Sequence, residues 1–92
     1  MNNELYRSKY QYERLIKSLN DNYNRLNTVY YNAIACRKRI KENVEIDDTY
    51  FDAARLDKII KRLEENRNLI INNLLPQARY QYNIIVNKIS KL

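Results

Sequence analysis

The chain has 92 residues, with 17 Lys and Arg against 11 Asp and Glu, and so carries a formal net charge of +6. This length allows one domain, residues 1–92, with a thin core. The absence of histidine and glycine excludes Ser-His-Asp catalysis and a Gly-rich phosphate loop, and one cysteine, Cys36, excludes an internal disulfide. We therefore expect no enzyme activity, no metal and no cofactor, and we expect Cys36 to be a small buried apolar residue.

The first predicted helix covers residues 3–43, because apolar residues recur there every seven positions, with further apolar rows beside them. Residues 20–24 are poor helix formers and would allow a break into two helices. The apolar spacing runs through this segment without a change of phase, which favours one continuous helix. The main row is Leu5, Tyr12, Leu19, Leu26, Ala33 and Ile40, flanked by Ile16, Tyr23 and Tyr30 on one side and by Leu15, Val29 and Cys36 on the other.

A turn is predicted at residues 44–48. Four cations within residues 37–41 suit the negative end of a helix dipole, and Asn43 can adopt the left-handed conformation that often ends a helix. Thr49 and Asp52 then approximate a capping box for the next helix.

The second predicted helix covers residues 49–91. One apolar stripe runs from Leu56 to Leu74 and another from Ile71 to Leu92, offset by one residue. The offset coincides with Pro76, the single proline, which predicts a kink there because proline removes a helical hydrogen bond. A true break at Pro76, giving three helices, is the alternative.

Two long helices joined by a short turn predict an all-α fold, a long antiparallel two-helix hairpin. The apolar surface is wider than one hairpin can bury, so we expect a helical partner, either a second copy or a different chain, to complete a four-helix bundle. The predicted partner-binding residues are Tyr12, Leu19, Tyr23, Leu26, Tyr30, Ile71, Leu75, Tyr82, Ile85 and Ile89.

Charge is unevenly distributed along the predicted hairpin. Acidic residues gather at the tip, residues 42–57, and a basic band follows, formed by Arg37, Lys38, Arg39, Lys58, Lys61 and Arg62. This band leaves open an alternative function, a small basic nucleic-acid-binding helical protein.

The first fifteen residues contain no apolar segment typical of a secretory signal peptide, and no apolar run approaches the ~20 residues that cross a bilayer. We therefore expect a cytoplasmic protein, with no transmembrane segment, that either remains there or is exported without a cleavable signal.

The length, the two long helices and the central segment NVEIDDTYF, residues 43–51, resemble the small helical-hairpin accessory proteins of Gram-positive type VII secretion. These bind the helical N-terminal domain of LXG toxins and help to target it for export, so the resemblance implies a chaperone-like toxin partner. The chain has no Trp-x-Gly in its turn, and no tyrosine is followed four residues later by an acid. The resemblance therefore implies a member that relies on its companion for the export signal.

Overall fold

The computed structural model describes residues 3–42 and 49–92, and in these ranges it contains helices and no strand. Helix α1 spans Asn3–Glu42 and helix α2 spans Thr49–Leu69; a π-helical turn, η1 (Ile70–Leu74), then leads directly into helix α3 (Leu75–Ser90). The predicted all-α class is confirmed. The turn predicted at 44–48, with Asn43 before it, lies outside the described residues.

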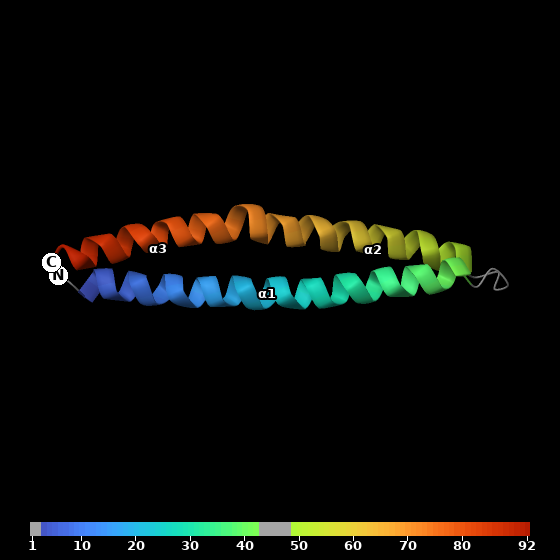
Figure 1. The fold of residues 1–92 in the computed structure, drawn as a ribbon, viewed down its shortest axis with the longest axis horizontal. Helices are drawn as coiled ribbons and strands as arrows, with labels where there is room; N and C mark the ends of the chain where they lie inside the picture. The colour runs from blue at the N-terminus through green and yellow to red at the C-terminus, as the bar shows by residue number, and fades with distance from the viewer. Residues whose placement is uncertain (1–2, 43–48) are drawn as a thin grey trace.

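The helices form a thin, elongated molecule (Figure 1). Helix α1 runs along one side, and α2, η1 and α3 run back along the other, so that α1 begins beside the end of α3. The molecule measures 69 × 15 × 15 Å and has a radius of gyration of 20.1 Å. A compact domain of this length has a radius of gyration of about 12 Å. The described chain is therefore elongated rather than compact. We call α1 the first rod and the continuous segment of α2, η1 and α3 the second rod; they lie side by side and run in opposite directions.

Helix α1 is continuous through residues 20–24, so the alternative of a break there is wrong. Leu19 and Tyr23 are both half-buried on the side of α1 that faces the other rod. Burial of this regular stripe therefore outweighs the weak helix propensity of the polar residues between them.

The second rod changes its helical repeat at η1 without being interrupted, so the alternative of a true break at Pro76 is also wrong. The backbone N–H of Leu75 donates to the carbonyl of Ile70, five residues back, which is the π-helical pattern. This wider turn holds one residue more than an α-helical turn and absorbs the one-residue offset between the two apolar stripes. Ile70, the first residue of η1, and Leu75, which follows it, are both buried, and the second rod bows at η1 in Figure 1.

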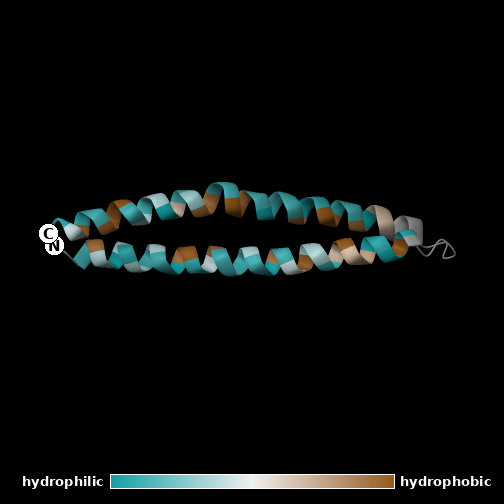
Figure 2. Ribbon diagram, viewed as in Figure 1, coloured by the Kyte–Doolittle hydropathy of each residue, from teal (hydrophilic) through white to brown (hydrophobic). Residues whose placement is uncertain are grey.

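The buried core is small. Among the described residues it consists of Ala33, Ala53, Ile70, Leu75 and Ala78, and Leu75 is the large side chain that is fully enclosed. Apolar residues are spread along the inner sides of both rods rather than gathered in one place (Figure 2). The accessible surface is 7592 Å², whereas a compact protein of this mass exposes about 5,700 Å². No described helix is long and apolar enough to span a lipid bilayer.

The π-helical turn gives a first prediction. Removing the exposed Asn72 together with Pro76→Ala should convert η1 into regular α-helix and keep both apolar stripes facing α1, because the one-residue offset is then gone. Thermal unfolding followed by circular dichroism should show a midpoint close to that of the unmodified chain.

The matched control removes the exposed Asp21 from the middle of α1, where no π-helical turn absorbs a change of phase. One half of α1 must then rotate by about 100° relative to the other, and the midpoint should fall sharply. Equal losses from the two deletions would contradict the role assigned to η1.

Candidate partner-binding surface

Within residues 3–42 and 49–92, Tyr82, Arg67 and Arg37 each donate a side-chain hydrogen bond to the opposite rod, and these three bonds lie on one side of the line where the rods meet. Tyr82 donates to Glu13 (3.1 Å), and Arg67 donates to Asn27 (2.9 Å). Glu13 and Asn27 are fourteen residues apart, about four helical turns, and therefore share one line along α1. The third is donated by Arg37 to Asp57 (2.7 Å), which also form an ion pair. We call this side the linked face.

Arg67 is the central contact of the linked face. Its guanidinium carbon lies 4.1 Å from the centre of the Tyr30 ring and 6.0 Å from that of Tyr31, and the two rings meet edge to face at 5.4 Å. A flat guanidinium over an aromatic face is stabilised by the ring quadrupole while its N–H groups remain free to donate. Arg67 therefore occupies a position in an otherwise apolar stripe without leaving its charge unpaired.

Tyr82 and Glu13 link the rods nearer their other end. The hydrogen bond from the hydroxyl to the carboxylate raises the pKa of Tyr82, and desolvation and the negative charge of Glu13 raise it further. A raised pKa means that folding favours the protonated hydroxyl, so this contribution to stability is present below the ordinary tyrosine pKa of about 10 and is lost as the pH rises above it. Lys9 also forms an ion pair with Glu13, with 3.8 Å between the Lys9 Nζ and Glu13 Oε1 atoms.

The opposite side of the rod carries exposed apolar side chains, and we call it the open face. Its large apolar residues are Leu15, Val29, Ile59, Leu69 and Leu74, all exposed. Leu15 and Val29 are fourteen residues apart and so share a line on α1, and Ile59 lies two turns before the groove residue Asn66 on α2. Cys36 continues the α1 line and is exposed, so the expectation that it is buried is wrong.

Two shallow grooves between the rods open on this face. The central groove, of about 390 Å³, is lined by Asn22, Arg25, Leu26, Asn66, Leu69 and Ile70. The second groove, of about 320 Å³, is lined by Tyr12, Leu15, Leu19, Leu74, Gln77, Ala78 and Gln81. Each groove is lined by apolar residues together with side-chain amides, a mixture that also occurs in protein interfaces.

Most of the predicted partner-binding residues lie where the two rods meet. Tyr12, Leu19, Tyr23, Leu26, Tyr30, Tyr82, Ile85 and Ile89 are half-buried there, and Leu75 is fully buried. Tyr12, Leu19 and Leu26 also line the grooves of the open face. Ile71 is exposed. It follows Asp57 by fourteen residues and Glu64 by seven, about four and two helical turns, and so lies on the linked face.

The exposed apolar residues of the open face are not among the predicted partner-binding residues. The row formed by Leu15, Val29 and Cys36 was visible in the sequence as a third apolar row, and its seven-residue spacing is the signal that identifies it. The apolar spacing predicts that Leu74, the last residue of the stripe that begins at Leu56, faces α1. The π-helical turn instead places Leu75 there, fully buried, and leaves Leu74 on the open face.

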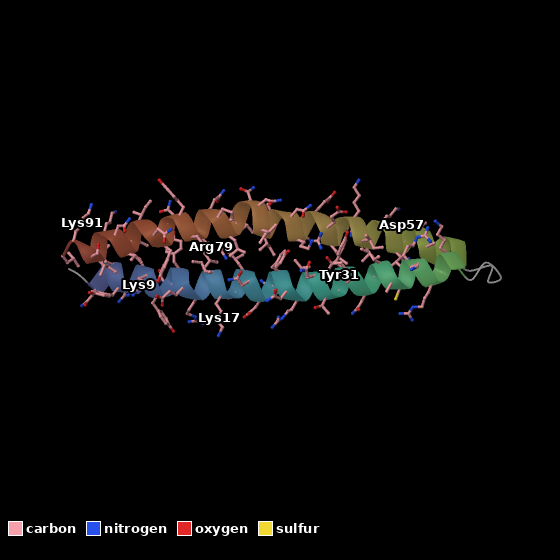
Figure 3. All side chains as sticks on the ribbon, in the orientation of Figure 1. Lys9, Lys17, Tyr31, Asp57, Arg79 and Lys91 are labelled. Atoms are coloured by element: carbon pink, nitrogen blue, oxygen red, sulfur yellow. The ribbon has the colours of Figure 1, made fainter. Side chains whose placement is uncertain are left out.

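The predicted basic band does not gather into one patch. Arg37 turns to Asp57 on the linked face, whereas Lys38, Arg39, Lys58, Lys61 and Arg62 are exposed. Residues 37, 38 and 39 are consecutive and so point in three directions from α1. Lys58 lies two positions from both Leu56 and Ile60, and hence on the outer side of α2. In Figure 3, Lys17 lies on the outer side of α1.

No family model, curated protein or solved structure matches this chain. Within residues 3–42 and 49–92, no cluster of His, Cys, Asp and Glu has the grouping that holds a metal ion.

The linked face gives a second prediction. Arg67→Ala should lower the free energy of unfolding by about 1–2 kcal/mol, because it removes both the stacking on Tyr30 and the hydrogen bond to Asn27. Arg67→Lys should recover only part of this loss, since an ammonium lacks the flat surface that stacks. Urea denaturation followed by circular dichroism measures the difference.

Arg79→Ala is the control, because Arg79 is exposed on α3 and a surface substitution there should change the free energy of unfolding by no more than about 0.5 kcal/mol. If the alanine variants of Arg67 and Arg79 lose the same stability, Arg67 does not hold the two rods together.

Proposed function

We propose that this protein is a non-catalytic interaction module whose open face packs against another helical protein, so that the two together form a four-helix bundle. The observation that carries the proposal is the contrast between the two faces. On the linked face, polar contacts bridge the rods and the exposed large aliphatic side chains are Ile34 and Ile71, whereas the open face presents two grooves and five exposed large aliphatic side chains.

The surface area of the rod supports a partner. The chain exposes 7592 Å², roughly 1,900 Å² more than a compact protein of its mass. A standard protein interface removes about 800 Å² from each partner, so covering one side of the rod is of the size that a stable complex requires. An antiparallel helix pair is also half of the arrangement found in four-helix bundles.

The proposal extends to the kind of partner that the resemblance implies. The chain resembles the small helical-hairpin accessory proteins of type VII secretion, which bind the helical domain of an LXG toxin. We propose the same accessory, chaperone-like role here, with the toxin's helical domain covering the open face during export. The hairpin shape and the exposed apolar face support this role.

Nucleic-acid binding is less well supported by the same geometry. The basic band is distributed around the rod, and the exposed tyrosines that would stack on bases, Tyr6, Tyr10, Tyr31 and Tyr80, are not among the residues of the open face. A protein of this alternative class would shift duplex or single-stranded DNA at low salt and release it steeply as salt is raised.

A matched pair of substitutions in η1 gives the third prediction. Leu74 on the open face is 40% exposed and Ile71 on the linked face is 38% exposed. Leu74→Glu should weaken the complex with the partner about tenfold or more, because it places an unpaired carboxylate in an apolar interface. Ile71→Glu adds the same charge to the same turn and should change affinity much less.

The partner is sought by co-expressing the chain with the products of the genes beside its own, and the complexes are measured by size-exclusion chromatography with light scattering and by calorimetry. A chain that remains a stable helical monomer with every one of these products would contradict the proposal. Equal effects of the two substitutions on binding would contradict the assignment of the open face.

A further inference from the structure

We infer that the partner is a different chain, and that its apolar helical surface is bordered by acidic side chains. This inference rests on the proposed function and specifies the chemistry of the partner. It comes from the charged residues that the structure describes along the border of the open face, which are mostly cations.

Four exposed cations border the open face. Arg25 lines the central groove and also lies beside Val29 in a shallow groove of about 440 Å³. Arg62 lies four residues before Asn66 and seven before Leu69, both in the central groove, and so shares their side of α2. The other two are placed by the same helical spacing. Arg39 lies fourteen residues after Arg25 on α1, and Lys88 lies seven residues after the groove residue Gln81 on α3, so both lie on the side of the open face.

The described acidic residues lie almost entirely elsewhere. Glu13 and Asp57 make contacts on the linked face. Glu64 follows Asp57 by seven residues, about two helical turns, and therefore lies on the linked face as well. Asp21 lies two positions from Leu19 and Tyr23, and Glu65 lies two positions from Leu63 and Arg67, so both are on the outer sides of their helices. Glu4, in the first turn of α1, shares the line of Arg25 but is 21 residues, or about 30 Å, away from it.

A second copy of the chain is a poor occupant for this face. A two-fold dimer brings the same surface of both copies together. The central groove lies near the middle of the rod, because Asn22 is close to the midpoint of α1. A two-fold axis there would bring Arg25 and Arg62 of one copy close to the same cations of the other, and like charges across an interface are unfavourable.

A helical protein with acids beside its apolar stripe fits better. Its apolar residues would fill the two grooves, and its carboxylates would reach Arg25 and Arg62 at their edge, where guanidinium groups bind carboxylates through paired hydrogen bonds. The amides of Asn22, Asn66, Gln77 and Gln81, which line the grooves, add hydrogen-bonding groups for a polar partner surface. The face therefore selects a partner by charge as well as by shape.

The test compares two designed antiparallel helical hairpins as probes, identical in their apolar face but bordered by glutamates in one and by lysines in the other. Binding to the full chain is measured by calorimetry at low and physiological salt. We expect the glutamate-bordered hairpin to bind at least tenfold more tightly, with an advantage that shrinks as salt is added.

Two double charge reversals make the test specific. Arg25→Glu with Arg62→Glu should abolish the preference for the glutamate-bordered hairpin. Lys17→Glu with Lys58→Glu changes the net charge by the same amount on the outer sides of the helices and should leave the preference intact. Light scattering of the chain alone, before and after each reversal, measures self-association.

The outcomes separate the inference from the proposed function. Equal binding of the two probes, sensitive to Leu74→Glu, would overturn the charge inference and leave the interaction role standing. A stable dimer of the chain alone that loses binding to both probes would also overturn the inference, because a second copy would then be the occupant. Failure of both probes and of every neighbouring gene product to bind would overturn the proposed function itself.

Discussion

Two helices lying side by side have only one line of contact, and this constraint governs the whole molecule. Residues on that line are covered by the opposite rod but remain open on both flanks, so most of them are half-buried. Full enclosure occurs at Leu75, and the other buried residues near the contact line are chiefly alanines, whose small side chains are covered easily. A chain built in this way gains little stability from its core and depends on what happens along the two flanks.

The two flanks differ in chemistry. On the linked face, Glu13, Asn27 and Arg37 of α1 each meet a polar partner on the other rod, and Arg67 stacks on Tyr30. Directional contacts of this kind fix how far one helix slides and rotates against the other. On the open face, apolar side chains contribute nothing comparable while they face water. The rod therefore already has a fixed register on one side and an unfilled surface on the other, which is the arrangement expected of half of an assembly.

The sequence predicted the extent and type of the helices well because both are local properties. Apolar residues at helical spacing marked the helices to within about one residue of their ends in the described ranges. The shift between the two stripes near Pro76 was also visible, but its cause was assigned to a kink alone. A change from a four-residue to a five-residue hydrogen-bond step leaves no signature of its own in the residue types, so η1 emerged only from the structure.

The candidate surface was harder to predict, since it depends on how each helix is rotated about its axis. Periodicity identifies Leu15 and Val29 as one row of α1, but it does not say which row of the second rod lies beside them. The structure places Leu74 beside Leu15 in one groove, and Leu69 with Leu26 and Arg25 in the other. Arg62, seven residues before Leu69, shares its side of α2. Under the proposed interaction role, apolar area alone would accept many helical partners, and the cations that border it would restrict the choice. Under that proposal, specificity would reside in the residues that border the apolar face, whereas the apolar residues themselves would supply the affinity.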